Sequence, residues 1–206
     1  SMSKASNALG LPIKGIEWFH WNSKILDKLV TKTINDGTKC IALVANTPEG
    51  AKIINAVANV NKSKRPKVFS HWGIVGGDFT QKVKLAQLVK VDLYFLNTLA
   101  FNSPKTAIGT ALKNSFEKKF GTHSAHEAFN GVAHGYDLVH LLALAIEKAG
   151  TTESTKVRSA LEKLGTYKGA MKTYNKPFTA SQHEALDASD YIMLKFNKQG
   201  FSEISK

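Results

Sequence analysis

Three polar loops in the first half of the chain carry the residues best suited to contact a small ligand. The richest is segment 69–79, which holds His71, Trp72, Gly73, Asp78 and two further glycines. An indole can cover an apolar part of a ligand, an imidazole can offer a hydrogen bond, and glycine lets backbone come close. A carboxylate there either pairs with an ammonium group or caps the helix predicted next. These residue types together favour non-covalent binding.

A second loop follows the apolar run 39–45 and contains Asn46 and Thr47, directly before Pro48. Threonine is a good N-cap and proline is favoured at the first helical position, so a helix is predicted to begin here. The free backbone N–H groups of such a helix start favour an anion such as a carboxylate. Plain helix capping is the alternative, and it is compatible with ligand binding.

The third loop is the aromatic stretch Glu17–Trp21, at the end of a β-prone run from Ile13. If Trp18, Phe19, His20 and Trp21 continue a strand, alternate side chains point to opposite faces. Two rings would then be buried and two would face a cleft or solvent. Core packing with one exposed ring and an aromatic cleft rim both remain open.

The elements that must position these loops alternate between strand and helix about four times in the first 120 residues. Strands are predicted over 13–21, 39–45, 67–70 and 92–101, and helices over 24–35, 47–60, 80–89 and 104–120. This alternation predicts right-handed crossovers and a parallel sheet, hence an α/β fold. In such a sheet the three loops lie side by side at the carboxyl ends of the strands, where ligands bind.

The second part of the chain has a different pattern. It predicts a long amphipathic helix over 126–149 and a second helix over 154–164, then a short helix at 183–186, a strand over 191–196, and a turn that leads to a final strand. We therefore divide the chain into an α/β sandwich (1–122), a helical pair (123–165) and a closing segment that returns to the sheet (166–206).

No known catalytic, cofactor or metal motif is found in the sequence. His123 and His126 form the densest histidine cluster, but Asn130 stands where the zinc helix motif has its second histidine. The single cysteine, Cys40, heads an apolar strand, which predicts a packed thiol. No nucleophile, base and orienting group assemble. We therefore predict no enzyme, no metal and no cofactor.

The composition limits the partners. The net charge is +12, but the lysines are spread along the chain and only two arginines occur, which favours a solvated surface over nucleic-acid binding. No apolar run approaches the roughly 20 residues that span a membrane. The first residues lack the apolar core of a signal peptide.

Segments 44–51 and 70–78 resemble the periplasmic solute-binding proteins of the branched-chain amino-acid transport type. Segments 133–143, 145–151 and 156–162 are similar to the paired helices that follow in that family, and 167–169, 183–186 and 190–193 to its closing region. The resemblance implies a type I periplasmic-binding fold, with two α/β lobes and a hinged cleft. It implies a ligand among amino acids, amides and small or aromatic carboxylates, and an ABC permease as partner. Carried over by position, the contacts fall in Asn46-Thr47 and His71-Trp72-Gly73.

The chain is about half as long as members of that family, and most of the first lobe has no counterpart in it. In the full fold, helix 126–149 packs against the first lobe, so its apolar face needs other cover. We expect the helix to fold onto the remaining sheet or to pair with a second copy as a homodimer. The resemblance predicts solute binding in a periplasmic or extracytoplasmic location. A ligand-sensing domain of a receptor, a truncated assembly module and an uncharacterised enzyme are the alternatives.

Overall fold

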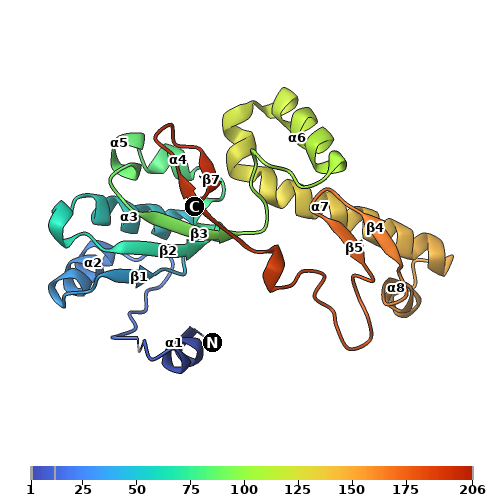
Figure 1. The fold of residues 1–206 in the computed structure, drawn as a ribbon, viewed down its shortest axis with the longest axis horizontal. Helices are drawn as coiled ribbons and strands as arrows, with labels where there is room; N and C mark the ends of the chain where they lie inside the picture. The colour runs from blue at the N-terminus through green and yellow to red at the C-terminus, as the bar shows by residue number, and fades with distance from the viewer. Residues whose placement is uncertain (1, 12, 206) are drawn as a thin grey trace.

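The α/β part of the molecule is built on a five-stranded sheet in the order β1-β2-β3-β6-β7 (Figure 1). The computed structural model describes residues 2–11 and 13–205, with backbone only for 123–128. The strands are β1 (Cys40–Ala42), β2 (Lys67–His71), β3 (Leu93–Asn97), β6 (Ile192–Phe196) and β7 (Ser202–Ile204). β1, β2 and β3 pair in parallel, whereas β6 and β7 are antiparallel additions from the end of the chain. The predicted α/β fold with a mostly parallel sheet is confirmed.

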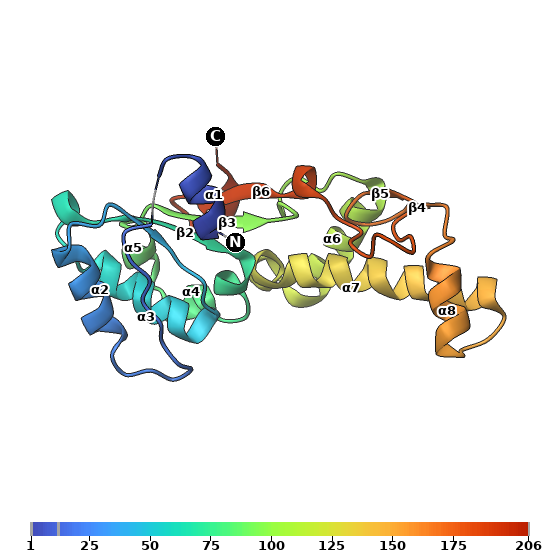
Figure 2. The same ribbon diagram turned by 90° about the horizontal axis from the view of Figure 1, so that it is seen from below.

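Short helices cover this sheet and enclose its core. They are α2 (Leu26–Asn35), α3 (Thr47–Ala58), the 3₁₀ helix η2 (Trp72–Val75), α4 (Phe79–Lys82) and α5 (Leu85–Leu88). Figure 2 shows α2, α3 and α4 on one side of the sheet. The fully buried Ile54 of α3 and Phe79 of α4 pack with Val68 and Phe95 of the sheet. Burial of these apolar side chains is what holds the crossovers in place.

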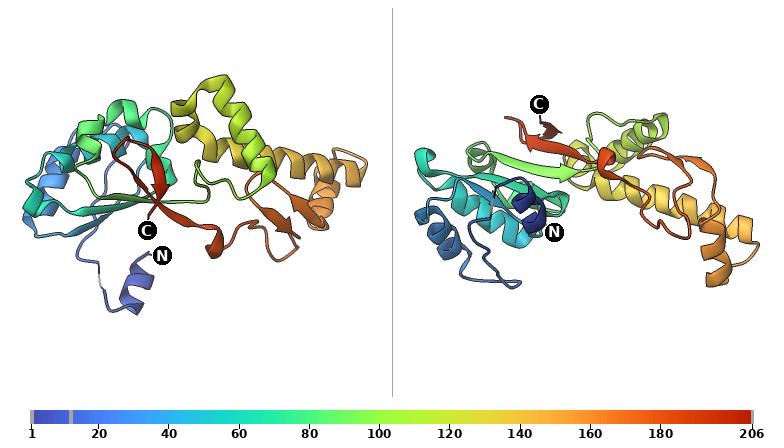
Figure 3. Two further views of the ribbon diagram at one scale, coloured as in Figure 1. Left: turned by 45° about the horizontal axis from the view of Figure 1, so that its top comes forward. Right: turned by 60° about the horizontal axis from the view of Figure 1, so that its bottom comes forward.

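The second part of the molecule extends away from the sheet, as both views of Figure 3 show. It comprises α6 (Ala107–Phe120), α7 (Thr122–Ala149), α8 (Ser154–Leu161) and a hairpin of β4 (Thr166–Lys168) and β5 (Thr173–Asn175). α7 packs against both α6 and α8. This part has its own small core, in which Phe101, Phe129, Ala133, Met171 and Tyr174 are buried. None of the helices among the described residues combines the length and the apolar character that crossing a membrane requires.

One face of α7 stays exposed. Leu138, Val139 and Leu142 lie on it and are 58 %, 67 % and 46 % exposed, whereas Leu144, 40 % exposed, points to another side of the helix. The expectation that this helix folds onto the remaining sheet is therefore wrong. α6, α8 and the β4–β5 hairpin pack against α7, and most of α7 lies beyond the sheet (Figure 1). Pairing with a second copy stays a prediction.

The structure corrects two expectations at the edge of the sheet. Segment 13–21 forms no strand, and Trp18 and Trp21 are 84 % and 75 % exposed. Sequence propensity alone does not make a strand, because a strand also needs a partner for its backbone groups. Cys40 is exposed, not packed. It lies on β1, which is the edge strand and covers only three residues.

Further differences concern the helices and the hairpin. The helix predicted over 80–89 is broken into α4 and α5, because Val83 takes an extended conformation between them. No helix forms at 183–186; a 3₁₀ turn at Ala188–Asp190 with a capping box precedes β6 instead. The β4–β5 hairpin was not predicted. The other predicted helices and the last two strands are confirmed within a few residues at their ends. α1 (Met2–Ala8) is the short helix at the start.

Candidate functional site

The loops that follow β1, β2 and β3 lie at one edge of the sheet because these strands run parallel. At this edge, further hydrogen bonds join the residue that follows β1 to the end of β2. The Leu43 N–H donates to the Phe69 carbonyl at 2.7 Å, and the Ser70 hydroxyl donates to the Leu43 carbonyl at 2.8 Å. The first two loops therefore leave the sheet in a fixed relation to each other.

Asn46 and Thr47 stand at the start of α3, as predicted. Asn46 occupies the N-cap position but makes no side-chain cap bond, and it is exposed. Thr47 is 7 % exposed, and its hydroxyl donates to the Ile74 carbonyl at 3.1 Å and also bonds the Gly76 carbonyl. The Thr47 side chain thus fastens α3 to η2, whereas the Asn46 amide faces solvent.

His71, Trp72 and Gly73 form a compact unit after β2. His71 Nδ1 accepts a hydrogen bond from the Gly73 N–H at 3.0 Å, so a neutral ring carries its proton on Nε2 and presents a donor there. The His71 and Trp72 rings meet edge to face with centroids 6.3 Å apart. A Cβ added to Gly73 would lie 2.4 Å from His71 Cε1 and 3.3 Å from Asn46 Oδ1. Only glycine leaves room for the His71 ring this close to Asn46.

Asp78 lies at the N-cap position of α4, but its side chain makes no cap bond. It forms an ion pair with Lys82 one turn later. The hydrogen bond from Lys82 holds the pKa of the Asp78 carboxyl below its usual range. The capping alternative is therefore wrong, and the ammonium group that Asp78 meets in this structure belongs to Lys82.

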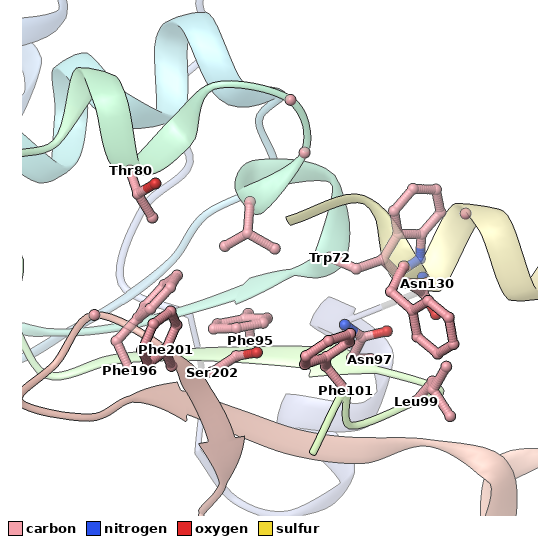
Figure 4. Close-up of a pocket in the computed structure, with 16 residues that line it drawn as sticks. Trp72, Thr80, Phe95, Asn97, Leu99, Phe101, Asn130, Phe196, Phe201 and Ser202 are labelled. Carbon is pink, nitrogen blue, oxygen red and sulfur yellow. The ribbon is translucent and has the colours of Figure 1, made fainter. Parts of the chain in front are cut away.

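A cavity of about 170 Å³ lies beside this edge, between the sheet and the first turns of α7 (Figure 4). Of the six predicted site residues, only Trp72 lines it, with Val75, Gly76 and Gly77 from the same loop. The sequence analysis missed most of the walls: Phe95, Asn97, Leu99, Phe101, Phe129, Asn130, Phe196, Phe201 and Ser202. Asn97 ends the third strand, so the rule that located the first two loops could have found it.

Polar side chains connect the end of β3 to α7 at the margin of the cavity. Asn97 is 6 % exposed, and its side-chain oxygen accepts from the Thr98 N–H at 2.8 Å. The Thr98 hydroxyl donates to Asn130 Oδ1 at 3.0 Å and lies 2.8 Å from His134 Nε2. Burial lowers the pKa of His134, an effect that the charge of Asp137 partly offsets. The α/β part and α7 are thus joined by a hydrogen-bonded chain as well as by aromatic packing.

The described residues contain no group of three His, Cys, Asp or Glu side chains that could hold a metal ion. The side chains of His123 and His126, which form the densest histidine cluster in the sequence, lie outside the described residues. Nothing in the described geometry of the loops therefore directs the site toward metal chemistry.

Comparison with known proteins places this architecture among binding proteins. A family model described as periplasmic binding protein matches residues 1–199. A type 1 periplasmic binding protein from Bordetella pertussis Tohama I is similar with a TM-score of 0.78 and 17 % identity, over 98 % of this chain and 55 % of that one. A leucine binding protein from Thermotoga maritima is similar with a TM-score of 0.73 and 17 % identity, over 97 % and 53 %.

A solute binding protein of an ABC transporter from R. palustris, solved in complex with benzoate, has a TM-score of 0.70 and 11 % identity, over 98 % of this chain and 52 % of that one. No curated protein matches the chain in sequence. The chain thus spans about half the length of the solved proteins that it resembles, and at these identities the likeness shows the fold.

Proposed function

The chain belongs to the periplasmic binding protein family, and we propose that it binds a small solute as part of an ABC-transporter substrate-binding protein. The resemblance seen in the sequence is thereby confirmed at the level of the family and the fold. The proposed solute is an amino acid, an amide, or a small or aromatic carboxylate. Similar solved proteins include binding proteins for leucine and fatty acids and one in complex with benzoate.

The observation that carries the proposal is the meeting of two loops at the carboxyl edge of the sheet. Gly73 brings the His71 ring next to the Asn46 amide, and Trp72 stands between these groups and the cavity. This is where ligands bind in open α/β sheets. It supplies polar groups and an apolar surface within one loop, as small-molecule sites do.

The chemistry of this edge suits a carboxylate. His71 offers an Nε2 donor, Asn46 an exposed amide, and the start of α3 free backbone N–H groups that favour an anion. In this proposal Thr47 positions the loop that contains η2 through its hydrogen bonds to that helix. The Asp78 carboxylate, which is paired with Lys82, contributes to the electrostatic field beside the site. Binding is non-covalent, and we propose no catalysis, in keeping with a family and with structural neighbours that are binding proteins.

The family name implies an extracytoplasmic location, and we propose the periplasm or its equivalent, with an ABC permease as the receiving partner. The alternative roles are a ligand-sensing domain of a receptor and an assembly module. The exposed Leu138, Val139 and Leu142 favour the second of these, since apolar patches mark contact surfaces. A homodimer through 126–149 would be visible by sedimentation, and Val139→Glu should then return the chain to a monomer.

Calorimetry with a panel of amino acids, amides and carboxylates tests the proposal. Trp72→Ala is expected to weaken the binding of a hit at least about tenfold, because a stacked aromatic contact and its apolar burial are lost. Trp18→Ala is the matched control, since Trp18 is 84 % exposed, outside the cavity and on an irregular segment.

Trp18→Ala should leave the affinity for the solute unchanged. If no solute of the panel binds, or if the two tryptophan variants weaken binding equally, the proposed site is wrong. The wild-type chain and both variants should be compared by circular dichroism first, so that a loss of binding reports on the site.

A further inference from the structure

We propose that the cavity between β3, β6 and the first turns of α7 holds one uncharged aromatic ring of the solute. The inference deepens the proposed function and rests on it in one respect: the polar end of the solute lies at His71 and Asn46. The ring itself is assigned from the walls of the cavity, which belong to segments far apart in the chain (Figure 4).

The walls are aromatic and already arranged. Phe95 and Phe129 are each 1 % exposed, so their rings are fixed by packing. Phe95 lies 5.3 Å from Phe196, centroid to centroid, and Phe101 meets Phe129 edge to face at 5.4 Å. Aromatic rings prefer offset or edge-to-face neighbours at 4.5–7 Å. The cavity is thus surrounded by aromatic side chains that already pack in the arrangements that rings prefer.

No acidic, basic or imidazole side chain is among the described residues that line the cavity. Its polar groups are neutral, and two of them are engaged, since Asn97 accepts from the Thr98 N–H and Asn130 from the Thr98 hydroxyl. A charge placed here would lose its hydration without gaining a counter-ion. The part of the solute that enters must therefore be uncharged, and a carboxylate must stay outside.

The size of the cavity sets the size of the group. Its volume is about 170 Å³. An engineered cavity of about 150 Å³, lined by aliphatic and phenyl side chains, takes up benzene. Sites for whole drug-sized ligands are larger, at about 300–1,000 Å³. The cavity thus has room for a single six-membered ring.

Trp72 links the cavity to the polar loop. It lines the cavity, is 52 % exposed, and contacts the His71 ring edge to face. A solute with its ring in the cavity and its carboxylate near His71 would lie against the indole of Trp72. The walls come from the sheet on one side and from Phe129, Asn130 and Gly131 of α7 on the other. A bound ring therefore contacts both parts of the molecule at once.

Two glycines of α7 allow a matched test. Gly131 lines the cavity, and a Cβ added there meets no atom within 4 Å. Gly135 lies one turn further along, is equally open, and does not line the cavity. Gly131→Leu should reduce the space for a ring, and Gly135→Leu should not. Both replacements favour the helix, because glycine is a poor helix former, so neither is expected to unfold the chain.

The probes are phenylacetate and acetate, which share the carboxylate and differ by the ring. Calorimetry on the wild-type chain should show phenylacetate at least about tenfold tighter than acetate. Gly131→Leu should remove that advantage and leave acetate unchanged, and Gly135→Leu should alter neither. Equal affinity for the two acids in the wild-type chain, or equal effects of the two glycine variants, would overturn the inference.

Toluene separates this inference from the proposed function, because it has a ring and no carboxylate. If neither acid binds, but toluene shifts the phenylalanine ring signals of the wild-type chain in NMR and not those of Gly131→Leu, the cavity assignment holds and solute binding by the loops fails. If toluene shifts no ring signal, the cavity assignment fails, whatever acetate does.

Discussion

Replacing Asp137 by alanine is expected to lower the free energy of unfolding of the α6–α8 part by about 3 kcal/mol or more. Asp137 lies on α7 and is 1 % exposed. Its two oxygens accept from the Ala170 N–H at 2.6 Å, the Met171 N–H at 2.9 Å and the Tyr174 hydroxyl at 2.9 Å. This carboxylate therefore holds the turn between β4 and β5 onto α7.

The magnitude follows from what alanine leaves behind. Three buried donors lose their acceptor, and each unsatisfied buried group costs about 1–3 kcal/mol. Removing the buried charge itself returns part of that loss, so the lower end of the sum is the expected value. Asp137→Asn keeps one acceptor oxygen but turns an NH₂ group toward the donors. It should fall between wild type and alanine.

Urea unfolding measures the loss of stability, and amide hydrogen exchange measures the local loss of protection in the turn between β4 and β5. The Ala170 and Met171 amides should lose protection first in the variants, because they bond directly to Asp137. Glu147→Gln is the control, since it removes one negative charge from an exposed position of the same helix. A change below about 1 kcal/mol in Asp137→Ala, the size of one ordinary net hydrogen bond, or unchanged protection of both amides, would refute the reasoning.

Two further predictions concern the same hairpin. Gly169→Ala should destabilise the chain, because its Cβ would lie 2.6 Å from both Asp137 carboxylate oxygens, whereas Gly165→Ala meets no atom within 4 Å and should be neutral in the same urea experiment. Burial, followed by the charge of Asp137, raises the pKa of Tyr167 to about 12. The unfolded tyrosine loses its proton near pH 10, so stability should be full below that pH and fall as pH rises from about 10 to about 12. Tyr167→Phe should flatten this decline in thermal unfolding measured across that range, and an unaltered slope would contradict the assignment.

Local patterns were sufficient for most of the α/β part. The threonine and proline at 47–48 place the start of α3 correctly, and the apolar runs place β2 and β3. Segment 13–21 shows the limit of such patterns. It has the composition of a strand, but forms none, and among the described residues β1 stays the edge strand with no partner on its outer side. The same holds for Cys40, whose apolar neighbours indicate burial while its position on the edge strand exposes it.

The predicted site was located in part. The rule that parallel strands expose their following loops at one edge brings His71, Trp72 and Asn46 together, as the structure has them. It did not reveal that Thr47 and Asp78 are engaged by η2 and Lys82. The Thr47 contacts join residues that are remote in the chain, whereas Lys82 stands at the i,i+4 spacing from Asp78, which is a local signal that the sequence does carry.

The sequence by itself determined the fold class, through local periodicity, turn chemistry and the order of elements, and the family, through its resemblance in segments such as 44–51 and 70–78. Only the tertiary structure decided the cavity and the hydrogen bonds by which Asp137 holds the turn between β4 and β5 onto α7. Phe95 meets Phe196, and Asp137 meets Ala170, across long stretches of chain. Such contacts arise from how β6 pairs with β3 and how the turn between β4 and β5 packs on α7, and neither is encoded in the pattern of any single segment.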